Sequence, residues 1–199
     1  MTSILKADTI QDAAGNNIIN ENANTITIGA SGDTITIPSG ATLTNNGTAT
    51  GFNNPAFLAY SGSTRNPSDA TVTDLQIDTE VFDTGSCFNT STYTFTPNVA
   101  GKYLLFAAIR VGSDTSRPAF IEMQARIRKN GGDCANQLLS SYSASNLDAF
   151  NIPITTVAEA NGSSDAFKID TYLDVDAGTI TISSGQHQTY FGGYKLTGV

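Results

Sequence analysis

The chain has 199 residues, of which 39% are hydrophobic and only 14% charged, and its formal net charge is −8. This length suits one domain with a sizeable core plus an appendage, but not two full domains. The acidic balance argues against a phosphate-neutralising surface, so we expect no nucleic-acid partner. The abundance of Thr, Ser, Asn and Gly favours extended strands with short turns over helices.

The start of the chain and its cysteines bear on where the protein is made. Residues 1–6 lack a basic segment followed by an apolar run, so we expect synthesis in the cytoplasm without a signal peptide. The apolar run 103–109 is too short to span a bilayer, so we expect no membrane insertion. Cys87 and Cys134 are the only cysteines. A disulfide bond between the two cysteines is left as an alternative, and free thiols are favoured because a reducing compartment disfavours disulfides.

Short alternating strands are predicted before residue 54. The segments NTITIGASG, DTITIPSGA and TLTNNGTATG repeat hydrophobic residues at a spacing of about nine, between Gly-, Ser- and Asn-rich turns. The hydrophobic residues of these stalk strands are Ile26, Ile28, Ile35, Ile37 and Leu43. A lone chain of such strands leaves its backbone unpaired, so copies wound about a common axis would have to complete it. The open alternative is a disordered, low-complexity linker.

A second region is predicted at residues 54–199, after an Asn-Asn-Pro turn cluster. It opens with an apolar strand at 56–60. The alternation in 88–95 and the apolar run 103–109 predict two consecutive strands paired antiparallel, the second buried at the centre of a sheet. Further strands are expected at 72–77, 119–129, 149–157, 166–175, 179–183 and 188–196. Loops are expected at 61–70, 112–118, 130–136 and 158–164.

Two spaced motifs in this region resemble the C1q-like branch of the C1q and tumour-necrosis-factor jelly rolls. An aromatic-Asp pair precedes Tyr-x-Phe-x-Pro and Gly-x-Tyr, and the chain finishes with Phe-x-Gly-x-x-Leu. The matching residues are Phe82, Asp83, Tyr93, Phe95, Pro97, Gly101, Tyr103, Phe106, the run 125–131, Phe191, Gly193 and Leu196. The resemblance implies an all-β jelly-roll sandwich that assembles as a homotrimer and acts as a binding module. The usual Asn-x-x-Asn-x-Tyr motif is reduced to residues 87–89, so no calcium or ligand position is transferred.

The opening LKADTIQDAAGNN and the later TITIP segment are similar to the starts of fibre and other virion proteins of marine bacteriophages. The matching residues are Lys6, Asp8, Ile10, Gly15, Asn16 and 35–40. The resemblance implies a virion location, with residues 1–53 as an attachment arm or β stalk that contacts other virion proteins. With the head, it predicts a trimeric tail fibre or adhesin that binds a glycan or protein on the host surface. Two alternatives stay open: a capsid-decoration (cement or head-fibre) protein at three-fold positions, and a bacterial C1q-like surface lectin.

Few residues could support catalysis or metal binding. His187 lies in a predicted Gly-Gln-His-Gln turn without a nucleophile that spacing would pair with it, so we expect no catalytic residue, no cofactor and no enzyme. Alternation places Asp170, Asp174 and Asp176 on one strand face, where carboxylates could hold calcium, although a solvated face is the favoured interpretation. The basic run 126–129 could meet an acidic polysaccharide, and an ordinary strand is favoured there too.

The aromatic residues are expected to serve burial, in the core or at a trimer seam. They include Phe57, Tyr60, Phe95, Tyr103, Phe106, Phe191 and Tyr194. None forms the exposed stacking row that single-stranded nucleic acid needs. The glycine pair 192–193 lies between aromatic residues, so we expect these glycines to let a ring or another backbone approach closely.

Overall fold

The structure of the chain, a computed structural model, divides into two units, Met1–Thr50 and Gly51–Val199. The residues it describes are 34–44, 46, 54–113, 120–140, 149–176 and 178–197. These residues form strands and turns but no helix, so none of them belongs to a helix long and apolar enough to cross a membrane. The predicted boundary between residues 53 and 54 stays a prediction.

In the first unit, residues 34–44 form no strand. Ala41 N donates to Pro38 O at 3.1 Å and closes a turn. The exposed hydrophobic residues of this segment are Ile35, Ile37 and Leu43. These side chains have no strand partner among the described residues, so the β stalk stays a prediction about neighbouring copies. The other two stalk residues, Ile26 and Ile28, lie outside the described residues.

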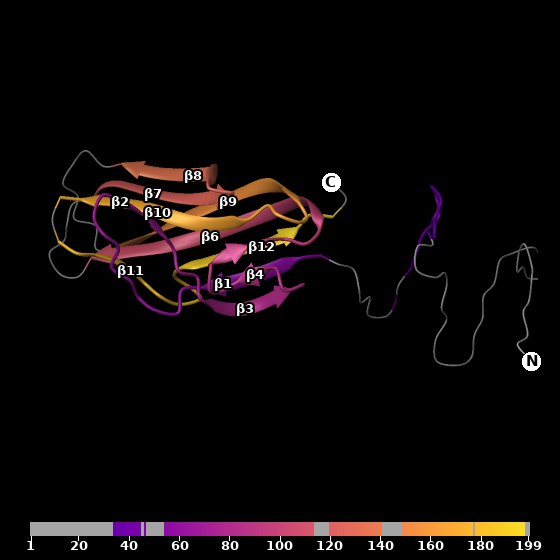
Figure 1. The fold of residues 1–199 in the computed structure, drawn as a ribbon, viewed down its shortest axis with the longest axis horizontal. Coiled ribbons are helices and arrows are strands. Elements are labelled where there is room, and N and C mark those ends of the chain that lie inside the picture. The colour runs from indigo at the N-terminus through magenta and orange to yellow at the C-terminus, as the bar shows by residue number, and fades with distance from the viewer. Residues whose placement is uncertain are drawn as a thin grey trace, which may run out of the picture. The chain divides into compact units, whose positions relative to one another are not determined.

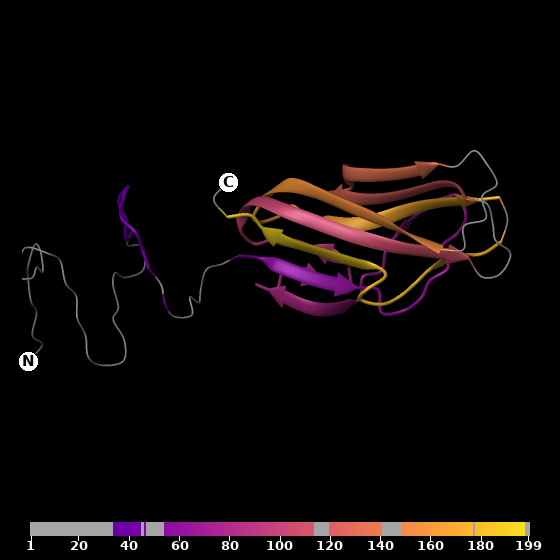
Figure 2. The same ribbon diagram turned by 180° about the vertical axis from the view of Figure 1, so that it is seen from behind.

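The second unit, called the head below, has its strands in two layers (Figures 1 and 2). The strands are β1 (Ala56–Tyr60), β2 (Thr71–Asp74), β3 (Thr79–Thr84), β4 (Phe88–Asn89), β5 (Thr94–Phe95), β6 (Ala100–Ser113), β7 (Phe120–Lys129), β8 (Gly132–Ser140), β9 (Ala149–Asn161), β10 (Phe167–Val175), β11 (Ile180–Ile182) and β12 (Tyr190–Lys195). Buried residues alternate along most of them, as in β1, where Phe57 and Ala59 face the core. Because side chains alternate with a period of two residues, each sheet has one face directed toward the core.

The first sheet has β6 at its centre. On one side β6 pairs along its length with β9, and on the other side with β12 and, further along, β11. The sheet continues from β12 to β1 and β3, with all pairs antiparallel. The prediction that 103–109 forms a central strand is therefore confirmed.

The second sheet has the order β4-β5-β10-β7-β8, and β2 also pairs with β10. The chain crosses between the sheets after β1, β2, β3, β5, β6, β8, β9 and β10, as in a jelly roll. The predicted antiparallel pair between 88–95 and 103–109 is wrong, because β5 belongs to the second sheet and β6 to the first. Alternation shows that each strand has one buried face, but it does not show which sheet the strand joins.

Aromatic rings from both sheets meet in the core. The Phe57 ring stacks on Phe88 and Phe95, with centroids 4.8 and 4.3 Å apart, and Phe95 meets Tyr103 edge-on at 5.7 Å. The buried Tyr103 hydroxyl donates to Val99 O at 2.6 Å. Burial raises the pKa of Tyr103 to about 12. The motif that crosses from β5 to β6 therefore ties the two sheets together.

The loop predicted at 130–136 is wrong, because a two-residue turn leads directly into β8. Asn130 and Gly131 have φ angles of 51° and 83°. Two positive φ angles are typical of a type I′ hairpin turn, which Asn-Gly favours. The loop predicted at 158–164 also starts too early, since β9 continues to Asn161.

Candidate self-association surface

The solvent side of the first sheet carries a broad set of apolar side chains. Strand register places one row across the sheet through Thr155, Phe106, Gly192, Leu58 and Phe82. A second row runs through Val157, Leu104, Tyr194 and Ala56, and a third through Pro153, Ala108, Tyr190 and Tyr60. We call Leu58, Phe82, Leu104, Phe106, Val157, Tyr190 and Tyr194 the open face. Phe82, Val157 and Tyr194 are 48%, 53% and 45% exposed.

A glycine allows the aromatic side chains of the open face to lie flat on the sheet. A Cβ at Gly192 would lie 2.5 Å from Phe106 Cζ and 3.2 Å from Leu58 Cδ1. The Phe106 ring therefore lies over the glycine backbone, as predicted for this glycine pair. Tyr190 meets Phe106 edge-on, with ring centroids 6.3 Å apart.

Polar and charged residues lie toward the two ends of the open face. Lys102 pairs in register with Glu159 at one end of β6 and β9, and Arg110 with Asn151 at the other. An apolar centre with a polar rim is the usual composition of a protein interface. The arrangement therefore indicates a surface for another protein chain.

A shallow depression of about 440 Å³ adjoins the open face. Its lining is Leu58, Phe106, Gln186, His187 and Tyr190. His187 is exposed in a turn, as predicted. The depression gives the open face a concave area that an apolar side chain of a partner could fill.

Exposed apolar side chains also flank an edge strand of the opposite sheet. Leu138 and Leu139 of β8 are 50% and 43% exposed, and Ile121 of the neighbouring β7 is 45% exposed. Register places Leu139 beside the buried Met123 on the inner side of the strand and Leu138 beside Gln124 on its outer side, so the two leucines flank the edge. We call these three residues the edge patch. Sequence reasoning missed β8, because 130–136 was predicted as a loop and no strand was predicted at Leu138 and Leu139. The Asn-Gly pair at 130–131 predicts a hairpin turn, and with the later Leu-Leu pair it could have revealed this strand.

The basic run on β7 is neutralised by carboxylates. Arg126 Nε lies 2.7 Å from Asp170 Oδ1, Arg128 Nη1 lies 3.3 Å from Asp170 Oδ2, and Lys129 Nζ lies 2.9 Å from Asp165 Oδ2. Asp165 has a lowered pKa, mainly because of the hydrogen bond from Lys129. The run is therefore an ordinary strand with an ion-paired outer face, and the acidic-polysaccharide interpretation loses its free cations.

The three aspartates considered for calcium do not form a cation site. Asp170 is 3% exposed and engaged by two arginines, whereas Asp174 is half-buried and Asp176 exposed farther along the chain. Within the described residues, no group of three or more His, Cys, Asp or Glu side chains could hold a metal ion.

The remaining sequence-predicted residues divide between core and surface. Those buried between the sheets are Phe95, Pro97, Tyr103 and Phe191. Tyr93 is half-buried in a turn with φ of 59°, Gly101 has φ of 145°, and Leu196 N donates to Lys102 O at 2.8 Å. Cys87 is buried and Cys134 half-buried, and both are free thiols whose pKa values burial raises.

The comparisons with known proteins support the fold. No protein-family model matches the chain, and no curated protein matches it. Murine APRIL at pH 5.0 is similar, with a TM-score of 0.53 and 14% identity over 72% of this chain and 99% of that chain. The pH 8.5 structure of murine APRIL gives 0.52 and 15% over the same shares. The globular domain of zebrafish complement 1qA gives 0.47 and 14% over 71% and 97%. The head therefore has a jelly-roll sandwich fold similar to that of the two murine APRIL structures.

Proposed function

We propose that the chain is a non-enzymatic structural and binding protein that works as a homotrimer. The observation that carries this proposal is the open face, where large apolar and aromatic side chains occupy most positions of a sheet surface. Exposed apolar patches of this kind mark interfaces in soluble proteins. Burying it between copies would also explain why β6 is apolar on both faces.

Two different patches favour a ring over a two-fold dimer. A two-fold interface uses the same patch on both copies, whereas a closed ring joins two different patches head to tail. The open face and the edge patch lie on different sheets and provide such a pair. We propose that the β8 edge of one copy, with Leu138 on its outer side and Leu139 on its inner side, packs against the open face of the next copy, near Phe106 and Tyr190.

For the location, we propose a bacteriophage virion, with residues 1–53 attaching to other virion proteins and the heads touching the host surface. The support is the similarity of the N-terminal segment to virion proteins and its exposed isoleucines, which three copies could cover together. Three heads on one stalk would also turn weak surface contacts into strong attachment, since linked sites raise the effective concentration. Of the two virion locations, we propose the tail fibre rather than capsid decoration.

The trimer is tested by sedimentation of the full chain and matched variants at micromolar concentration. Phe106→Asp on the open face, or Leu138→Asp with Leu139→Asp on the edge patch, should give monomers. Val72→Asp is the control, because Val72 is 51% exposed on the outer face of the second sheet and belongs to neither patch.

Mixing the two monomeric variants then distinguishes a ring from a two-fold dimer. The intact edge of the first variant can bind the intact open face of the second, so mixed dimers should form that cannot close. A wild-type protein that sediments as a clean monomer would overturn the proposed trimer.

The virion location is tested separately by electron microscopy of phage particles with labelled protein. Density on the tail supports the fibre, and density on the shell supports decoration at three-fold positions. Absence from particles, with binding to a glycan array, would instead favour a bacterial surface lectin.

A further inference from the structure

A small cavity lies apart from the open face, at the side of the head where β2 meets the first sheet. Its volume is about 180 Å³, and its lining is Ser61, Arg65, Asn66, Pro67, Thr73, Asp74, Leu75, Gln76, Ile182 and Thr189. No lining residue belongs to the open face or the edge patch. Pockets for drug-sized ligands measure about 300–1,000 Å³, so this cavity suits a single small ring.

Backbone hydrogen bonds hold the walls of the cavity in place. Arg65 N donates to Ile182 O at 3.0 Å, and Ile182 N donates to Arg65 O at 2.7 Å. Ser61 N donates to Thr189 O at 3.0 Å. The loop after β1 is therefore fixed to the first sheet on both sides of the cavity, so a ligand would enter a preformed site.

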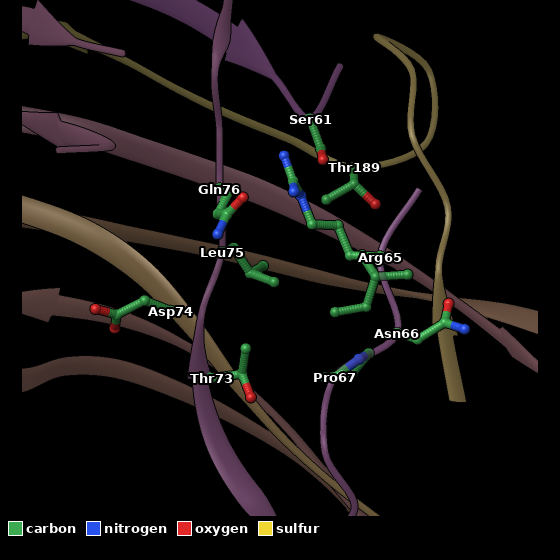
Figure 3. A pocket seen from close by; sticks show the side chains of 10 residues that line it. Ser61, Arg65, Asn66, Pro67, Thr73, Asp74, Leu75, Gln76 and Thr189 are labelled. Atoms are coloured by element: carbon green, nitrogen blue, oxygen red, sulfur yellow. The ribbon is translucent and has the colours of Figure 1, made fainter. Parts of the chain in front are cut away.

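The lining combines an apolar wall with unpaired polar groups. The apolar residues are Pro67, Leu75 and Ile182. In Figure 3 the Arg65 side chain extends between Gln76 and Ser61. The Gln76 and Asn66 amides have no hydrogen-bond partner among the described residues. Each amide offers two N–H donors and one carbonyl acceptor.

The charged groups at the cavity are already paired. Arg65 Nη2 donates to Asp78 Oδ2 at 3.0 Å, and Asp74 at the rim pairs with Lys168. An anionic ligand would have to compete with Asp78 for the guanidinium. A neutral ligand can use the remaining guanidinium N–H groups and the two amides without breaking either ion pair.

We propose that this cavity binds one neutral sugar ring. Hydroxyl groups donate and accept, which matches the mixed amide and guanidinium lining, and the C–H face of a pyranose can lie on the apolar wall. A single ring that makes a few hydrogen bonds binds weakly, with a Kd of roughly 1 mM or above. The inference rests on the proposed function in one respect, because the sugar would be the host-surface ligand of the head. The cavity itself lies within one copy and does not depend on trimer assembly.

Saturation-transfer NMR on the full chain tests this site with glucose, galactose, mannose and N-acetylglucosamine, and with glucuronate as the anionic probe. At least one neutral sugar should give a signal that Gln76→Ala weakens about tenfold, because two hydrogen bonds are lost. Gln76→Glu keeps the shape but removes the donors and should weaken binding similarly. Gln186→Ala, in the separate depression, should leave the signal unchanged.

Sedimentation and thermal melts of each variant separate this result from the trimer. Loss of the signal in folded variants with an unchanged oligomeric state supports the site. No signal from any neutral sugar, stronger binding of glucuronate, or equal signals in wild type and both Gln76 variants would overturn the proposal, whatever the oligomeric state.

Discussion

Replacing Gly193 with alanine should destabilise the core of the head. A Cβ at this position would lie 2.6 Å from Leu105 Cδ2, 3.1 Å from the backbone oxygen of Leu104 and 3.2 Å from Phe57 Cε1. Leu105 and Phe57 are themselves buried and the oxygen belongs to the paired strand β6, so β12 must move to relieve the contact. Overpacking of a filled core costs about 1–3 kcal/mol.

Thermal melts of wild type and variants at one protein concentration measure this cost. At about 2–4 °C per kcal/mol for a domain of this size, the Tm should fall by about 2–12 °C. Gly132→Ala is the matched control in a strand, since its Cβ would meet only Lys129 O at 3.5 Å. Adding Leu105→Val to Gly193→Ala removes the closest methyl group and should recover part of the loss. A Tm for Gly193→Ala equal to that of Gly132→Ala would refute the packing argument.

Three other predictions concern ionisable groups. The lowered pKa of Asp165 contributes stability that is present above its ordinary value of 3.8 and is lost as the pH falls through the lowered value. Asp165→Asn should therefore lower the Tm at neutral pH, and a pH series of melts should show this difference shrinking in acid. Asp170→Ala leaves Arg126, whose side chain is 12% exposed, without its partner and should cost about 3–5 kcal/mol in urea unfolding; an unchanged midpoint would contradict it. Burial raises the pKa of the Cys87 thiol, so a thiol reagent should modify it far more slowly in native than in unfolded protein, and equal rates would count against the structure.

The sequence predicted strands well where burial alternates strictly. The predicted ranges 56–60, 119–129 and 166–175 match β1, β7 and β10 to within one residue. β3 was missed because most of its residues are exposed and give no alternation. β8 was missed because turn-forming composition was interpreted as a loop, although Asn-Gly specifies a tight hairpin.

The candidate surface was harder to predict than the fold. Phe106 and Tyr194 were predicted to lie in the core or at a trimer seam. The two-residue alternation of a strand cannot decide between core and seam, because it shows only that neighbouring side chains point to opposite faces. Strand register decides it: Phe106 lies beside Gly192 and Leu58 on the outer side, while Leu105 faces inward. The assignment needs long-range pairing that no local pattern contains.

The two outer faces of the head differ in a way that bears on the open face. On the second sheet, β10 alternates buried Ile169 and Leu173 with Lys168 and Tyr172, so a solvated side is polar. On the first sheet, β6 places leucine and phenylalanine at positions 104 and 106 on the corresponding side. Antiparallel sheets that face water on one side normally alternate apolar with polar residues. Because β10 follows that rule and β6 breaks it, the open face has the composition of a protein interface.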